Sequence, residues 1–358
     1  MPPNLALQLD YPWAKKPLVA SAPMLNIASA PLAVSVSAAG GLGFLAGGFD
    51  VSALENNFEE AVDLIKRSPA DSVVHQNYTS TGVLPIGVGF LNWGADLPNS
   101  IAAIKKYRPC AAWLFGVKSL PDDLRPWVEQ VRAVTENKTK IWIQLGTVAE
   151  AVAVAESLDP DVLVVQGSDA GGHGLAHSAS VVSLVPEVQD ALAARRLKKD
   201  IPLIAAGGIV DGRGMAAALA LGASGVVMGT RFLASAEANV ARGYQNEVLR
   251  ASDGGINTAR STVYDRVRGI LGWPVQYDGR GVVNQSYIDA VERGMNDEEN
   301  RALYEEEMKK GDAGWGPNAR LTTYAGTGIG LVRETLPAAD IVANVIREAK
   351  NILEGLSI

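Results

Sequence analysis

Residues 166–174, QGSDAGGHG, place a histidine among four glycines directly after the apolar run 162–165. Imidazole is the side chain that most readily exchanges a proton near neutral pH. Glycines let a flat ligand lie close to the backbone, but they also allow tight turns. Two interpretations follow from the residues alone. The stretch is either a turn that contains His173 by chance or a ligand-binding loop that aims His173 at its ligand.

Two more glycine clusters follow later apolar runs, AAGGI at 205–209 and MGTR at 228–231. In α/β barrels the loops after strands seven and eight usually form a phosphate site, because backbone N–H groups there point at the anion. Ordinary tight turns are the alternative for each cluster. No Gly-x-Gly-x-x-Gly joins the first strand to its helix, so a dinucleotide fingerprint is absent. The predicted phosphate-binding residues are Gly207, Gly208, Gly229 and Thr230.

A phosphate site beside QGSDAGGHG suggests a planar cofactor with a phosphate tail, and flavin mononucleotide (FMN) fits. The stiff turn SAPM at 21–24 could meet the edge of the flavin, and the side chain of residue 166 could bond the polar atoms of the ring. Gly171, Gly172 and Gly174 would give clearance for the ring. The residues predicted to surround the ring are Ala22, Pro23, Met24, Gln166, Gly171 and Gly172.

These residues need elements that hold them at one place, and the chain supplies short apolar runs bounded by glycine or proline. Such runs lack polar alternation, as is typical of parallel strands covered on both faces. Helical patterns lie between them, at 51–67, 100–107, 122–136, 147–157 and 211–221. This rhythm predicts an α/β fold, a closed (β/α)8 TIM barrel, with an open doubly wound sheet as the alternative. The eight runs are 18–22, 43–46, 84–90, 111–115, 140–145, 162–166, 202–206 and 225–228.

The rhythm ends after the eighth run. Residues 252–324 are richer in Arg, Asp, Asn and Gly, which predicts an inserted, mostly helical lid over the barrel mouth. We therefore expect a flavin-binding core at 1–251, the lid at 252–324, and a closing segment at 325–358 that carries an amphipathic helix. Trp273 and Trp315 are interpreted as packing residues of this lid, with platforms for the substrate as the alternative.

Composition limits the possible partners. A formal net charge of -7 disfavours nucleic acid and anionic membranes. Cys110 is the only cysteine, so neither an intramolecular disulfide nor a thiolate metal cluster can form, and no metal site is predicted. No signal peptide or apolar segment of about 20 residues is recognisable, so a cytoplasmic protein, monomeric or homodimeric, is expected.

Several stretches together resemble the nitronate monooxygenases, formerly called 2-nitropropane dioxygenases. The resemblance extends from about residue 17 to 350, and YDRVRGILGWP and YDGRG are similar to the fungal branch. It implies an FMN barrel that oxidises alkyl nitronates with dioxygen to a carbonyl compound and nitrite, with neutral nitroalkanes as a further candidate substrate. The family's catalytic base maps onto His173. The stretches are SAPM (21–24), AGGLGFLAGG (39–48), QGSDAGGHG, PLIAAGGI (202–209), GVVMGTRFLAS (225–235) and AGTGIGLV (325–332).

The chain also departs from the family pattern. Leu114 stands where many bacterial members have a second histidine, and Gly89 stands where an asparagine is often found. Gln144 could replace part of the lost hydrogen bonding. His177 has no motif behind it and is interpreted as a loop residue, and His75 could line a site, although a surface or core role is favoured. A guanidinium suits nitro or carboxylate oxygens, which makes candidates of Arg231, Arg260, Arg266 and Arg268, although each could equally be a solvated or paired arginine.

Two other functions stay open. The first is a related FMN enzyme that uses NAD(P)H to reduce an enoyl thioester or a quinone. The second is a flavin- or phosphate-binding protein without catalysis. The histidine in QGSDAGGHG disfavours the second, because a loop that only binds needs no titratable group.

Overall fold

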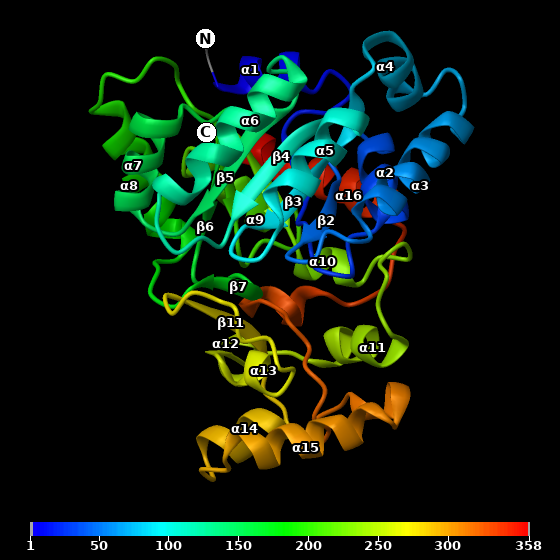
Figure 1. Cartoon of the computed structure of the whole chain (residues 1–358), viewed down its shortest axis with the longest axis vertical. Coiled ribbons are helices and arrows are strands. Elements are labelled where there is room, and N and C mark those ends of the chain that lie inside the picture. Colours follow the sequence, from blue (N-terminus) through cyan, green and yellow to red (C-terminus); the bar gives the residue numbers. More distant parts are fainter. Residues whose placement is uncertain (1–2, 357–358) are drawn as a thin grey trace.

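The computed structural model describes residues 3–356, and its centre is a ring of eight parallel strands (Figure 1). The strands lie in the order β1-β9-β8-β6-β5-β4-β3-β2. A parallel bridge between Ala20 and Leu42 joins the two ends of this order, so the sheet is nearly closed. The predicted barrel is confirmed, and the open sheet is wrong. The strands are β1 (Leu18–Ser21), β2 (Phe44–Gly48), β3 (Leu84–Leu91), β4 (Pro109–Phe115), β5 (Lys140–Leu145), β6 (Val162–Gln166), β8 (Leu203–Ala206) and β9 (Gly225–Met228).

Helices cover the outside of the ring, as the strand–helix rhythm predicts. Local signals set their ends: a capping box of Thr147 and Glu150 starts α7, and Asp211 caps α9. The helices are α1 (Pro3–Asp10), α2 (Ala30–Ala38), α3 (Leu54–Arg67), α4 (Val73–Thr81), α5 (Leu97–Tyr107), α6 (Arg125–Thr135) after a 3-10 turn (Asp122–Leu124), α7 (Val148–Leu158), α8 (Val181–Ala193), α9 (Gly212–Ala220) and α16 (Ala338–Gly355).

The two faces of the barrel strands are buried in different clusters. The outer face packs against the helices, and the inner face is filled by aromatic side chains. Phe44 lies 5.1 Å from Trp113 and 5.0 Å from Trp142 between ring centroids. The indole of Trp142 donates to the Tyr11 hydroxyl at 2.6 Å. The interior below the mouth is therefore a packed core, which leaves the carboxyl ends of the strands as the place for a site.

The segment after β9 lies across this carboxyl end (Figure 1). It contains the predicted helices, but also two strands that were not predicted. β10 and β11 form a three-stranded antiparallel sheet with β7, which is the histidine-bearing loop itself. The elements are β7 (Gly172–Leu175), α10 (Thr230–Leu233), α11 (Arg242–Arg250), α12 (Gly254–Asn257), β10 (Thr258–Ser261), α13 (Val263–Arg266), β11 (Tyr277–Val282), α14 (Gln285–Val291), α15 (Asp297–Met308) and two 3-10 turns (Gly311–Gly314, Thr327–Leu331).

The chain ends on the predicted amphipathic helix. α16 packs against α9 and α2, and its buried face includes Ile341, Val342, Val345 and Ile346. The division into a core, a lid and a closing segment stays a prediction. Within residues 3–356, the helices are too short or too polar to cross a membrane.

Candidate active site

A cavity of about 390 Å³ lies at the carboxyl end of the barrel, between the strand ends and the lid. This size is in the range of small-molecule sites. The cavity brings together the residues predicted to bind the cofactor or act as the base, from four strand ends (β1, β6, β8 and β9), whereas Gly174 does not line it. These residues are Ala22, Pro23, Met24, Gln166, Gly171, Gly172, His173, Gly207, Gly208, Gly229 and Thr230.

The glycine clusters after β8 and β9 form a smooth wall of this cavity. Gly207 and Gly208 have φ of +110° and +74°, which side chains rarely adopt. A Cβ on Gly207 would lie 2.9 Å from the backbone nitrogen of Ala170. The Thr230 hydroxyl oxygen accepts the N–H of Gly326 at 3.0 Å, which leaves its proton free to donate. The wall therefore presents backbone and one hydroxyl donor to the cavity.

The glycines of the histidine loop differ in what they do. A Cβ on Gly171 would lie 2.4 Å from the backbone of Ala325 and Gly326, so this glycine lets the lid approach the loop. A Cβ on Gly172 would meet no atom within 4 Å, but φ is +67° there. Gly171 thus makes room for the protein backbone, whereas the space beside Gly172 is open.

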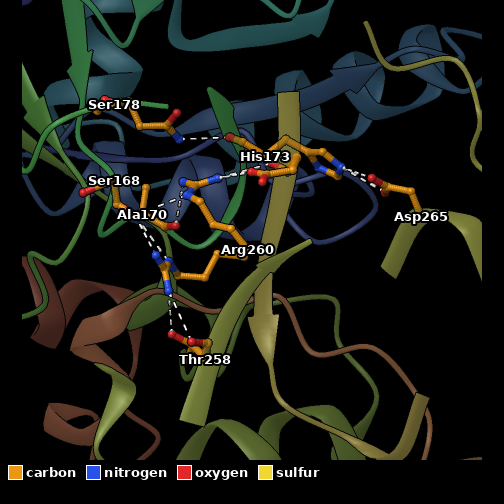
Figure 2. Close-up of polar contacts among 10 residues, drawn as sticks. Ser168, Ala170, His173, Ser178, Thr258, Arg260 and Asp265 are labelled. Carbon is orange, nitrogen blue, oxygen red and sulfur yellow. Dashed lines mark hydrogen bonds and ion pairs between the residues drawn. The ribbon is translucent and has the colours of Figure 1, made fainter. Parts of the chain in front are cut away.

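Two arginines from the lid hold this loop in place (Figure 2). Arg260 donates to the carbonyls of Ser168 and Ala170 at 3.3 and 3.2 Å, and it pairs with Asp278 at 2.9 Å. Arg280 donates to the Ser168 carbonyl at 3.2 Å. Burial lowers the pKa of Arg280, and the neighbouring Arg260 lowers it further. The lid thus supplies hydrogen bonds that the loop cannot make for itself.

His173 points from β7 toward a carboxylate of the lid (Figure 2). Its Nε2 lies 2.9 and 2.8 Å from the two oxygens of Asp265, whose side chain is buried, and the His173 side chain is mostly buried. The Tyr324 hydroxyl donates to the same carboxylate at 2.8 Å. Burial, and next the charge of Asp265, raise the pKa of Tyr324 well above its ordinary value. Tyr324 therefore remains a neutral donor.

Trp273 is part of the site rather than only a packing residue of the lid. Its ring stacks on the imidazole of His173, with centroids 3.9 Å apart and an interplanar angle of 7°. Trp315 also lines the cavity. The sequence interpretation missed this because a tryptophan in a polar segment has the same appearance in both roles.

Of the candidate arginines, Arg268 alone lines the cavity. Its guanidinium lies 5.5 Å from the ring centre of Tyr324. Burial lowers its pKa, but Tyr324 and Tyr304 outweigh that effect and raise it, so Arg268 stays charged. Arg231 is buried and donates to the Glu334 carbonyl at 3.0 Å, and Arg266 pairs with Asp297. These two, like the loop-holding Arg260, are structural.

The remaining histidines lie outside the cavity wall. The Nδ1 of His75 on α4 lies 3.2 Å from the Ile65 carbonyl. His177 lies in the bend after β7. His173 is the histidine that the fold brings to the ligand space.

The departures at positions 89 and 114 have different consequences. Leu114 is fully buried in the cluster between the sheet and the helices, because strand alternation turns Trp113 and Phe115 toward the cavity instead. Gly89 does line the cavity, and a Cβ there would lie 2.3 Å from the ring of Pro23. Gln144 also lines it and accepts the Trp113 indole N–H at 3.0 Å.

Sequence reasoning missed Asp265, Tyr324 and Arg280. Asp265 is 92 residues from His173 in the chain. A short α13 and the β7–β11 pairing bring them together, and neither has a hydrophobic period that would reveal it. The one signal was the stretch YDRVRG, which contains Asp265 and Arg268.

Comparisons with known proteins agree with this geometry. A family model for nitronate monooxygenase matches residues 124–348. The nitronate monooxygenase npaC of Metarhizium robertsii is 47% identical over 353 residues, which cover 98% of this chain and 96% of that protein. A nitronate monooxygenase of Neurospora crassa is 36% identical over 97% of this chain and 92% of that protein.

A solved structure supports the fold. The nitroalkane oxidase of Streptomyces ansochromogenes superposes with a TM-score of 0.72 at 24% identity, covering 98% of this chain and all of that one. The two nitronate monooxygenases match nearly the whole chain, and the family model matches residues 124–348. The chain belongs to the nitronate monooxygenase family of oxidoreductases.

Proposed function

We propose that the protein binds FMN in this cavity and oxidises alkyl nitronates with dioxygen to a carbonyl compound and nitrite, with His173 as the proton-moving group. The observation that carries the proposal is that the glycine wall and His173 line one cavity. The relatives named nitronate monooxygenase support the substrate class.

The residues present fit FMN. Gly207, Gly208, Gly229 and Thr230 would hold the phosphate, because backbone at these positions is open to the cavity and Thr230 keeps a proton to donate. The turn of Ala22, Pro23 and Met24, together with Gln166, would border the ring. Bound FMN would supply electron transfer and the reaction with dioxygen.

The chain's own residues then act on the substrate. His173 would remove the α-proton of a neutral nitroalkane, or hydrogen-bond the nitro oxygens of a nitronate. The charged Arg268 would attract these oxygens, since a guanidinium matches two oxygens on one centre. Phe115 and Trp273 line the same cavity and would keep water from the reacting atoms.

The decisive experiment is the visible absorbance of the purified protein during addition of an alkyl nitronate without oxygen. We expect flavin absorbance that the nitronate bleaches, because the nitronate is the electron donor. An unchanged flavin spectrum would contradict the proposal. A protein with no flavin absorbance even after reconstitution would remove the cofactor from it.

NADH is the matched control for the reductase alternative. We expect NADH to leave the absorbance unchanged on the timescale of nitronate bleaching. Rapid bleaching by NADH, with no effect of nitronate, would instead identify a reductase. A His173→Ala variant separates the binding-only alternative, because we expect it to keep flavin and lose about 10²- to 10⁴-fold of nitroalkane turnover.

A further inference from the structure

We propose that Asp265 is a positioning residue that, held by Tyr324, fixes the tautomer of His173 so that Nδ1 is the nitrogen that accepts the substrate proton. This inference rests on the proposed function, in which His173 moves that proton. It adds the atom that does so and the lid residues that select it.

The first step is the bond at Nε2. Both carboxylate oxygens of Asp265 lie within 2.9 Å of this nitrogen. A carboxylate accepts hydrogen bonds and donates none, so Nε2 must carry a proton. The side chains of His173 and Asp265 are 13% and 6% exposed, so water competes little for this bond. In neutral imidazole the other nitrogen, Nδ1, then has the free lone pair.

The second step is the orientation of the carboxylate. The Tyr324 hydroxyl donates to Oδ1 of Asp265 at 2.8 Å. Because Tyr324 stays protonated, its bond always presents a donor to this oxygen. Tyr324 thus orients the Asp265 carboxylate from within the lid, and the same carboxylate contacts His173 of the barrel loop.

The third step is the orientation of the imidazole ring. Trp273 lies parallel to it at 3.9 Å, and the ring of Tyr324 lies 5.2 Å away at 55°. The backbone of His173 is paired with Gly279 of β11, and its carbonyl accepts the Gln166 amide at 3.1 Å. Rotation of the ring would break the stack and the Asp265 bond together. Since His173 lines the cavity and Asp265 occupies Nε2, Nδ1 is left for the substrate.

The arrangement serves both states of the reaction. Before proton transfer Asp265 accepts the Nε2 proton of neutral imidazole. After transfer the same carboxylate faces an imidazolium and stabilises its charge. A bond that only tied the lid to the barrel would select the same tautomer, but inverting that tautomer would then leave kcat for a neutral nitroalkane unchanged, and this difference can be measured.

The test is ¹⁵N NMR of the imidazole nitrogens in the flavin-loaded protein, through a pH series whose alkaline end leaves imidazole neutral. The chain has three histidines, so the His173→Ala spectrum assigns the signals. We expect the Nε2–H tautomer for His173 in the unmodified protein. The Nδ1–H tautomer there would overturn the proposal.

Asp265→Asn is the informative variant. Its Oδ1 can still accept from Tyr324, which places the new amide nitrogen at the Oδ2 position, 2.8 Å from Nε2, where its N–H favours an unprotonated Nε2 and a proton on Nδ1. We expect an inverted tautomer and a kcat for neutral nitroalkane lower by about 10²- to 10⁴-fold, with KM changed little. An unchanged tautomer would overturn the proposal.

Two further variants keep the test sharp. Asp265→Asn combined with Tyr324→Phe leaves the amide unoriented, so we expect mixed tautomers. Tyr324→Phe alone keeps the buried ring, and it replaces Asp265→Asn if that variant does not fold. We expect His173 in this variant to show a mixture of tautomers. A His173 that keeps the Nε2–H tautomer alone would contradict the proposal. Asp297→Asn, an exposed lid carboxylate paired with Arg266, should leave the tautomer unchanged.

The proposed function and this inference can fail separately. If Asp265→Asn inverts the tautomer but nitroalkane turnover stays, the positioning holds and His173 is not the base. If turnover falls while the tautomer stays, the base assignment holds and the positioning is wrong.

Discussion

Gly279 lies directly opposite His173 in the antiparallel pairing of β11 with β7. A Cβ on Gly279 would lie 2.7 Å from a ring carbon of Tyr324 and 3.5 Å from Nε2 of His173. The missing side chain is what allows Tyr324 to reach Asp265 beside the imidazole. A glycine of the lid thus determines how closely the lid can close on the histidine.

We expect Gly279→Ala to displace the Tyr324 ring and weaken its bond to Asp265. Overpacking at a tight contact costs about 1–3 kcal/mol of stability. If displacement of the catalytic groups raises the activation free energy by roughly 1.4 kcal/mol, kcat for a neutral nitroalkane falls about tenfold. Steady-state kinetics and urea unfolding measure both effects.

Gly281→Ala is the matched control on the same strand. Its Cβ would lie 3.1 Å from the Thr323 carbonyl and 3.2 Å from the Tyr264 ring and not against the Tyr324 ring, although the backbones of Gly281 and Tyr324 form an antiparallel bridge. We expect a smaller loss of kcat than in Gly279→Ala. Equal losses in the two variants would mean that β11 as a whole, and not the space beside Tyr324, matters.

The barrel could be predicted because its strands are apolar on both faces and end at glycine or proline. Runs such as 162–165 have no other common explanation once helices lie between them. The glycine wall could be predicted because backbone access requires particular residue types at strand ends. Both signals are local in the sequence.

The lid sheet could not be predicted. GHGL, TARS and YDGRGV carry glycine and arginine where strands usually alternate apolar and polar residues. These strands exist because they pair with one another, and their arginines bond the loop of the barrel. The partners of His173 follow from this pairing, so Asp265 and Tyr324 were invisible without it.

Arg268→Met tests whether the charged cavity residue binds the nitronate. A charge-assisted hydrogen bond contributes about 1.5–3 kcal/mol, so we expect KM for the nitronate to rise about 10- to 100-fold. Because the substrate is charged before and during the reaction, kcat should change little. Stopped-flow bleaching at several nitronate concentrations separates the two constants.

Arg266→Met is the control, since this arginine is half-exposed and pairs with Asp297 outside the cavity. It should leave KM near that of the unmodified protein. A fall in kcat without a rise in KM for Arg268→Met would assign that arginine to the transition state instead of substrate binding.

Gly207→Ala tests the glycine wall. At φ of +110° an alanine is strained, and its Cβ would meet the Ala170 nitrogen at 2.9 Å. Relief of this strain would move the loop out of its binding conformation, and restoring that conformation would cost about 1–3 kcal/mol, so we expect FMN to bind about 10- to 100-fold more weakly. Flavin released by heat, measured by fluorescence per mole of chain, reports the loss. Gly255→Ala, whose Cβ would meet nothing within 4 Å, should keep its flavin.

Asp289 ties α14 to the loop that contains Arg320, and this contact predicts a pH dependence of stability. It accepts from Gln285 and Arg293 at 2.7 Å each and pairs with Arg320, and its side chain is 3% exposed. Burial raises its pKa, but the hydrogen bonds from Gln285 and Arg320 outweigh burial and lower it overall. A lowered pKa in the folded state adds stability above the unfolded value of about 4, and this stability is lost as pH falls.

Asp289→Asn should therefore destabilise the protein by about 3 kcal/mol at neutral pH, because Arg320 would stay buried without its charge partner. The difference from the unmodified protein should shrink as pH falls below about 4, where the unmodified carboxylate is also losing its charge. Urea unfolding at neutral pH and below about pH 4 measures the difference in unfolding free energy between the variant and the unmodified protein at each pH. Glu305→Gln, in an exposed pair with Arg301, should cost less than about 1 kcal/mol at either pH. A gap for Asp289→Asn that does not depend on pH would show that its hydrogen bonds, and not its charge, stabilise the lid.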